Sequence, residues 1–314
     1  MIGMTAAPTA AEVQRHHRNL DLALRLQLWA TWITGAALLL AVLWSWTKIG
    51  TVTALFGNVL ALELKVMLGL GLVATVLGTW ITAALLGWCR EYLEQVLSRA
   101  IGQDVNLDRH QALHTTLSAY ITGAQWALPV GVLILTPLSL WALALFVRAL
   151  TGPTLGATEL VLIGLSLALP LTVPVALNNL ILAAVRRWLN LSSARLRGET
   201  GPPVLPAART LGHWLIFCAA LLGLNVLGSL GTLPTLALGP AFTAALPNLG
   251  ELSPALNISP GLITGVSAFI GASSLLGAVQ NGLLLWTMLA SRSFALSTAQ
   301  ALDERPNAPA LSPT

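Results

Sequence analysis

Charged residues are scarce in this sequence. Asp, Glu, Lys and Arg make up 9% of its 314 residues, whereas soluble domains carry about 25% charged residues. Hydrophobic residues account for 55%, and the mean hydropathy is +0.77. A soluble protein with so few charges would lack a polar surface, so the composition predicts an integral membrane protein.

Several motif classes are also missing. The two cysteines, Cys89 and Cys218, are expected near cytoplasmic helix ends, where thiols stay reduced, so no disulfide framework is predicted. Basic runs interleaved with aromatic residues are absent, which argues against a nucleic-acid partner.

His110 and His114 have a metal-ligand spacing but no third ligand, so neither a metal nor a cofactor is expected. The chain lacks a Walker loop, GxSxG and HExxH, which disfavours an enzyme; a lipid-modifying enzyme is the least favoured class, because the sequence juxtaposes no nucleophile and base.

Six long apolar segments lie between the charged stretches. About 20 residues of helix cross a hydrocarbon core of about 30 Å, and each segment is long enough. The predicted fold is therefore an all-α integral membrane protein, a bundle of about six transmembrane helices. The predicted spans are residues 28–47, 66–88, 119–147, 160–185, 211–230 and 262–290. They form a domain over residues 28–291, between a cytoplasmic segment 1–27 and a disordered cytoplasmic tail 292–314.

The distribution of basic residues predicts the orientation. Of the 16 Lys and Arg residues, 13 fall on the side of the six spans that carries both termini and 3 on the other side. Cytoplasmic loops are enriched in Lys and Arg, so both termini are predicted to be cytoplasmic. The connection 231–261 has five prolines and one charge, Glu251, and is interpreted as a re-entrant segment or a hidden seventh span. The lack of organelle-targeting signals indicates a bacterial inner membrane.

The six spans also group into three helical hairpins. The second helix of each ends in arginine, any residue and an aromatic residue: Arg90 and Tyr92, Arg186 and Trp188, Arg292 and Phe294. Gly102 and Gly198 extend the match between the first two hairpins at an offset of 96, and residues 32–36 (WITGA) match 120–124 (YITGA). A repeated two-helix unit explains these matches. So does the preference of arginine and aromatic residues for the membrane interface, and the sequence leaves both explanations open.

Polar residues inside the spans are the candidates for a solute path. No acidic or basic residue lies near the middle of a span, which disfavours an ion-coupled pump. Pro170 and Pro174 are predicted to kink the fourth span and free a backbone carbonyl. Amides both donate and accept hydrogen bonds, so they suit a permease-like or channel-like path for a neutral or weakly polar solute. The path candidates are Gln125, Asn178, Asn179, Asn225, Gln280 and Asn281. The alternative is that these amides hold helices together, at roughly 1 kcal/mol per bond.

The basic cytoplasmic residues support a second interpretation of the function. They predict a non-catalytic membrane subunit or scaffold that docks a partner or anionic lipid. The contact candidates are Arg90, Arg186, Arg187, Arg195, Arg197, Arg209 and His213. The lipid bilayer is the expected partner, while a homo-oligomer or another membrane protein is left open. The sequence identifies no solute.

Overall fold

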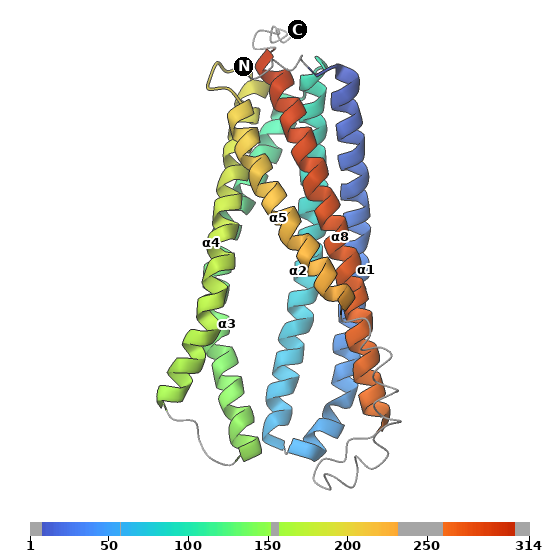
Figure 1. Ribbon diagram of the computed structural model, residues 1–314, viewed down its shortest axis with the longest axis vertical. Coiled ribbons are helices and arrows are strands. Elements are labelled where there is room, and N and C mark those ends of the chain that lie inside the picture. The colour runs from blue at the N-terminus through green and yellow to red at the C-terminus, as the bar shows by residue number, and fades with distance from the viewer. Residues whose placement is uncertain (1–7, 57, 152–156, 232–259, 305–314) are drawn as a thin grey trace. The chain divides into compact units, whose positions relative to one another are not determined.

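Every element in the described part of the chain is an α-helix. The computed structural model describes the backbone of residues 8–56, 58–151, 157–231 and 260–304, and most side chains outside 48–64, 138–174 and 260–270. The six helices in these ranges are α1 (Ala10–Phe56), α2 (Asn58–Ala100), α3 (Leu107–Thr151), α4 (Ala157–Leu196), α5 (Leu205–Gly231) and α8 (Pro260–Glu304) (Figure 1). The all-α prediction is confirmed. The connection 231–261 lies outside the described residues except at its ends.

Most of these helices are longer than a membrane is thick. α1 has 47 residues and α2 has 43, and at about 1.5 Å per residue each is roughly twice as long as a hydrocarbon core is thick. Three segments are long and apolar enough to cross a membrane: Ala10–Thr47, Leu68–Ala100 and Leu205–Gly231. They correspond to the predicted spans 28–47, 66–88 and 211–230. The spans 119–147, 160–185 and 262–290 stay predictions, because many of their side chains lie outside the described residues.

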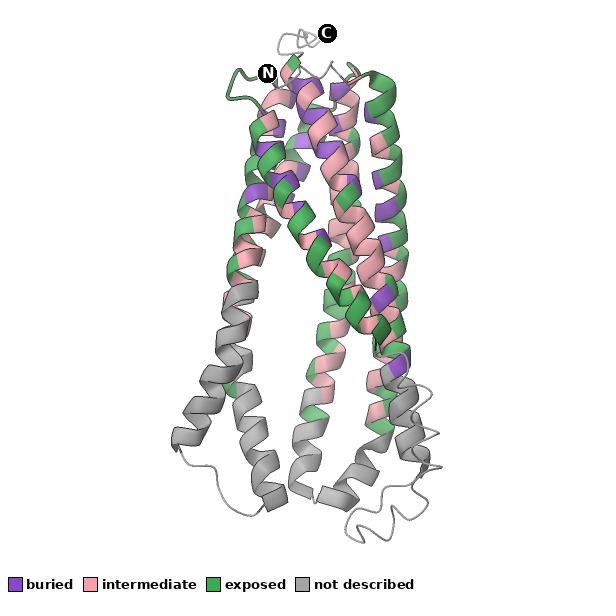
Figure 2. Cartoon of the chain, in the orientation of Figure 1, coloured by how far each residue is buried: buried purple, intermediate pink, exposed green. Residues whose placement is uncertain are grey.

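The chain divides into two compact units. The first comprises residues 1–15, 91–214 and 294–314, and the second comprises residues 16–90 and 215–293. Within the first unit, α3 packs along α4. Of the ten largest fully buried side chains that the structure describes, only Leu20 belongs to the second unit. Most of the buried residues that the structure describes belong to the first unit. The described residues of α2 in the second unit are exposed or half-buried (Figure 2).

Helices α2 and α4 end in the same backbone geometry. Gly102 after α2 and Gly198 after α4 have φ values of 84° and 75°, a left-handed conformation that glycine adopts readily. In both turns the glycine N–H donates to the carbonyl three residues earlier at 3.1 Å, and the next N–H donates to the carbonyl five residues earlier. The sequence match at an offset of 96 therefore coincides with a match in structure.

Side chains mark where α1 and α5 begin. Thr9 Oγ1 accepts a hydrogen bond from the Glu12 N–H at 3.3 Å, and Glu12 Oε2 accepts one from the Thr9 N–H at 3.1 Å, which is a capping box. At α5 the capping carboxylate comes from the end of α8. Asp303 accepts from the N–H groups of Val204 at 2.8 Å and Leu205 at 2.9 Å. A negative charge is favourable at a helix N-terminus, so Asp303 ties the end of α8 to the start of α5.

The end of α8 corrects the predicted disordered tail. The helix continues to Glu304, and Phe294 and Thr298 are fully buried within the first unit. Phe294, Thr298 and Leu302 are four residues apart, so they share one helix face, and all three are buried. The prediction is wrong for residues 292–304 because this helical period outweighs the polar composition. Residues 305–314 lie outside the described part of the chain.

In the second unit, α1 approaches α2 closely at a glycine. A Cβ atom on Gly35 would lie 2.6 Å from Thr79 Cγ2, so only glycine fits there without a shift of the neighbouring side chain. The preceding residue, Thr34, donates from Oγ1 to Gln280 Oε1 of α8 at 3.2 Å. Small residues and interhelical hydrogen bonds are the usual contacts between membrane helices, because lipid removes the hydrophobic drive between them.

Candidate functional site

A buried polar cluster joins α2, α3 and α4 within the first unit. The Tyr92 hydroxyl oxygen lies 2.8 Å from Ser192 Oγ and donates to the Leu189 carbonyl at 3.1 Å. The His110 ring stacks on the Tyr92 ring with centroids 5.0 Å apart, and His110 Nε2 lies 3.0 Å from Ser193 Oγ. Buried polar groups need partners, so these contacts hold α4 in one position against the other two helices.

His110 is neutral in this cluster at pH 7. Its side chain is fully buried, and burial lowers its pKa to about 4, with smaller contributions from His114 and Arg197. The sequence offers His110 and His114 as possible metal ligands, but their Nε2 atoms contact Ser193 and Asn190 instead, each at 3.0 Å. Among the described residues, no group of three His, Cys, Asp or Glu is placed to hold a metal.

Ser193 and His110 are a hydroxyl and a base that the sequence does not place together. They are 83 positions apart in the chain, so only the packing of α3 on α4 brings them into contact. Arg197 Nη1 also donates to Ser193 Oγ at 2.9 Å. Ser193 and His110 are both 0% exposed. His110 Nδ1 has no hydrogen-bond partner among the described residues. A nucleophile needs access to substrate and an oriented base, so this pair serves packing.

A hollow of about 410 Å³ is open at the surface of the first unit. It is formed by α3, α4 and the loop that follows α4. Its walls are Gln125, Ala183, Arg186, Arg187, Asn190, Leu191 and Pro202. Arg186 and Arg187 are exposed, and neither has an ion pair to a described acidic residue. The structure thus combines one predicted path residue, Gln125, with two predicted contact residues.

A contact between α3 and α4 involves one wall residue of this hollow, Asn190. Asn190 lies one helical turn after Arg186 and Arg187, so the three share a side of α4. Its Oδ1 atom lies 3.0 Å from His114 Nε2. An amide oxygen only accepts, so His114 Nε2 is the donor and the Asn190 NH₂ group remains a donor. The hollow is therefore lined by hydrogen-bond donors and positive charge.

The other predicted contact residues differ in whether their side chains have ion-pair partners. Arg195 donates to the Gly201 carbonyl at 2.9 Å and lies 3.8 Å from Asp303, while Arg197 pairs with Glu199 at 2.5 Å. In the second unit Arg90 pairs with an aspartate of α1, Asp21. Each of these three arginines thus has a carboxylate within 4.0 Å in the described part of the chain. Arg209 and His213 lie exposed on α5, away from the hollow's walls.

The predicted path residues are divided between the two units, so whether they line one path stays a prediction. Gln125, Asn178 and Asn179 belong to the first unit, and Asn225, Gln280 and Asn281 belong to the second. Gln280 accepts the hydrogen bond from Thr34 described above, and Asn225 is exposed on α5, a segment long and apolar enough to cross a membrane. Asn178 Nδ2 and Asn179 Oδ1 are buried atoms without a hydrogen-bond partner in the described part of the chain.

The predicted kink in the fourth span is not tested by the structure. The backbone of α4 is helical from Ala157 to Leu196, through both Pro170 and Pro174. The side chains of these prolines lie outside the described residues.

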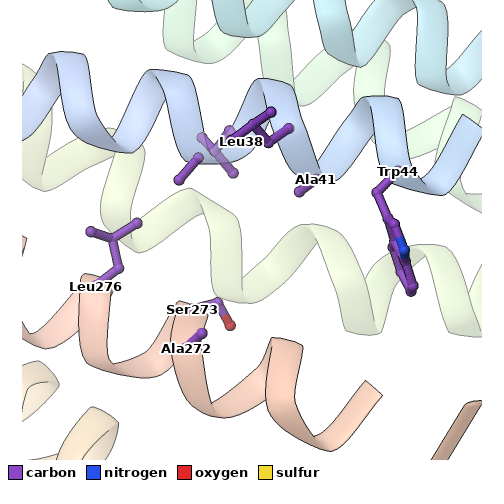
Figure 3. Close-up of a pocket in the computed structure, with 8 residues that line it drawn as sticks. Leu38, Ala41, Trp44, Ala272, Ser273 and Leu276 are labelled. Carbon is purple, nitrogen blue, oxygen red and sulfur yellow. The ribbon is translucent and has the colours of Figure 1, made fainter. Parts of the chain in front are cut away.

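A second hollow, of about 330 Å³, lies between α1 and α8 in the second unit. Figure 3 shows Leu38, Ala41 and Trp44 of α1 facing Ala272, Ser273 and Leu276 of α8 across it. The walls are apolar except for the Ser273 hydroxyl and the indole N–H of Trp44. The part of α1 that lines the hollow belongs to a segment able to cross a membrane. Such a groove suits contact with the lipid hydrocarbon and offers no polar path.

Comparisons with family models, curated proteins and solved structures give no match for this chain. The described structure by itself establishes an all-helical chain with three segments able to cross a membrane and contact lipid. It indicates no activity.

Proposed function

We propose that the chain is a non-catalytic membrane scaffold of six spans whose cytoplasmic side binds an anionic surface. The observation that carries this proposal is the hollow with exposed Arg186 and Arg187. Thirteen of the 16 basic residues share the side on which these arginines lie in the proposed topology, as expected for the cytoplasmic face of a bacterial inner membrane.

The contacts of the polar residues support a scaffold over an enzyme. The hydroxyl and base that lie together, Ser193 and His110, are both fully buried. Gln280, a candidate for a solute path, is used as a contact between α1 and α8. Asn190 accepts from His114. These polar groups bind one another across helices, which is the arrangement of a structural bundle.

One observation favours a second function, passage of a neutral or weakly polar solute. Asn178 and Asn179 each have a buried polar atom without a partner among the described residues. Unpartnered polar atoms are costly in a membrane interior unless water or a ligand reaches them. A water-filled path beside α4 would satisfy both amides.

Cysteine accessibility separates the two functions. Cysteine is placed singly at Asn178, Asn179, Gln280 or Asn281 in a Cys89→Ser, Cys218→Ser background and treated with a membrane-impermeant maleimide from each side. The scaffold predicts no labelling at any of the four positions. Thr200→Cys, at an exposed loop position, is the control and labels from the cytoplasmic side only. Labelling at residues 178 and 179 would replace the scaffold with the solute path.

A further inference from the structure

We propose that the hollow formed by α3 and α4 binds the phosphate group of an anionic phospholipid. This inference rests on the proposed scaffold function and names the ligand of its basic side. The site consists of the guanidinium groups of Arg186 and Arg187 with the side-chain amides of Asn190 and Gln125.

The chemistry of the walls selects an anion. Arginine presents a planar fork of N–H donors that matches the oxygens of a phosphate group. The Asn190 NH₂ group adds donors because its oxygen is already bonded to His114. Among the residues that the structure describes, the walls of the hollow include no acidic side chain. A bound cation would therefore find no carboxylate, whereas an anion would find charge and donors on one side of α4.

The contrast with neighbouring arginines shows that this charge is available. Arg195 and Arg197 follow on the same helix, and each lies within 4.0 Å of a carboxylate, on Asp303 and Glu199 respectively. Arg186 and Arg187 have no such partner among the described acidic residues and remain exposed. A phosphate group would provide the counter-charge that these two arginines lack within the described chain.

The position in the sequence selects a lipid as the source of the phosphate. Residues 160–185 carry no charge, and Arg186 follows at once, so the arginines lie where an apolar span meets the headgroups. Trp126, next to Gln125, is 69% exposed, as expected for an indole at the interface. Ala183 and Leu191 supply apolar wall, which suits the glycerol and upper acyl part of a lipid. Basic pockets on the cytoplasmic side of membrane helices are suited to such headgroups.

The test is the thermal stability of the full chain in neutral phosphatidylcholine–detergent micelles, with phosphatidylglycerol added in steps. A ligand that binds only the folded state raises Tm, and the rise grows with the logarithm of the ligand concentration above its Kd. We expect a rise of about 3 °C over the titration. The double variant Arg186→Gln/Arg187→Gln should need at least tenfold more phosphatidylglycerol for the same rise in Tm, since each basic residue contributes about 1 kcal/mol near an anionic surface. If the double variant does not fold, the two single variants should each need about fivefold more phosphatidylglycerol for the same rise.

A charge-matched control separates a site from diffuse attraction. Arg15→Gln/Arg18→Gln removes two exposed arginines from α1, outside the hollow, and should leave the phosphatidylglycerol concentration needed for a given rise in Tm unchanged. Equal losses in both double variants would overturn the site. An equal Tm rise with inorganic phosphate in phosphatidylcholine micelles would assign the hollow to free phosphate. If phosphatidylglycerol did not raise the Tm of the wild type, the lipid site would also be refuted. The maleimide labelling would still decide, independently of this result, between the scaffold and the solute path.

Discussion

The same four residues, Ile-Thr-Gly-Ala, occur in α1 at 33–36 and in α3 at 121–124, and they make different contacts. In α1, Thr34 donates to Gln280 of another helix, and Gly35 faces Thr79 of α2 with no room for a Cβ atom. In α3, Thr122 donates to a carbonyl of its own helix at 2.9 Å, and a Cβ on Gly123 would meet no described atom within 4 Å. The identical tetrapeptide is therefore helical in both places. Whether its threonine and glycine contact another helix depends on which helix lies beside them.

The two units differ in a related way. The first unit is held by fully buried polar side chains, among them His110, Ser192, Ser193 and Thr298. Most of the large apolar side chains that the structure describes as exposed, such as Trp29, Leu40 and Trp80, lie in the second unit, and fewer, among them Trp126, lie in the first. In a soluble protein so much exposed apolar surface would favour aggregation. On segments able to cross a membrane it is the surface that lipid covers.

The largest expected effect on the difference between the two units is that of acid pH. Protonation of His110 should lower the free energy of unfolding of the first unit. The folded-state pKa is about 4, against about 6.5 in an unfolded chain. Above pH 6.5 the group is neutral in both states and contributes nothing. As the pH falls from about 6.5 to 4 the unfolded state binds the proton first, so the free energy of unfolding should fall by up to about 3 kcal/mol.

The measurement is Tm in detergent between pH 7.5 and pH 4.5. The variant His110→Gln removes the titrating group but keeps an amide near Ser193, so its Tm should depend less on pH than that of the wild type. Glu91 and Glu199 titrate in both proteins, and subtracting the two curves removes their contribution. If Tm depended on pH in the same way in both proteins, the pKa of His110 would not be lowered by burial in the folded state, and this prediction would be wrong.

The paired glycines give the next largest effect and test the comparison directly. Gly35→Ala should lower the stability by about 2 kcal/mol, because the new methyl group overlaps Thr79 and overpacking typically costs 1–3 kcal/mol. Gly123→Ala, in the same tetrapeptide, should be neutral or stabilise by up to about 1 kcal/mol, since alanine favours helix over glycine. Thermal unfolding of both variants is the measurement.

A compensating change shows whether the contact itself is responsible. Thr79→Ala removes the atoms that the new methyl group would meet, so the double variant Gly35→Ala/Thr79→Ala should recover most of the loss. Equal destabilisation by Gly35→Ala and Gly123→Ala would mean that α1 and α3 are packed alike, and the comparison drawn from the structure would fail.

The helices were predictable from the sequence to a greater extent than their contacts. Composition and apolar length predict an all-helical membrane chain. The offset of 96 that relates Gly102 to Gly198 in the sequence, which leaves a repeat open, also relates two similar helix ends in the structure. These are local features. The contact between His110 and Ser193 is not, because it requires the packing of α3 on α4. The i, i+4 spacing of His110 and His114 was a usable signal of a shared helix face, but it does not reveal the partner.

The candidate site shows the same limit. Seven basic residues were predicted as contacts, and sequence position alone does not distinguish the paired Arg195 and Arg197 from the exposed Arg186 and Arg187. What distinguishes them is the position of carboxylates. Glu199 lies two residues from its partner and could have been noticed, whereas Asp303 comes from a helix 108 residues further along.

The smallest expected effect concerns the hydroxyl groups of the two tetrapeptides. A double-mutant cycle with Thr34→Val and Gln280→Met should give a coupling of about 0.6 kcal/mol, the usual value for a hydrogen bond between membrane helices. The matched cycle with Thr122→Val and Gln280→Met should give none, because Thr122 bonds to its own helix. Tm shifts of about 2 °C would report the first coupling. A coupling near zero at Thr34 would mean that Gln280 is not a helix contact and is free to bind water or solute, which would favour the solute path over the scaffold.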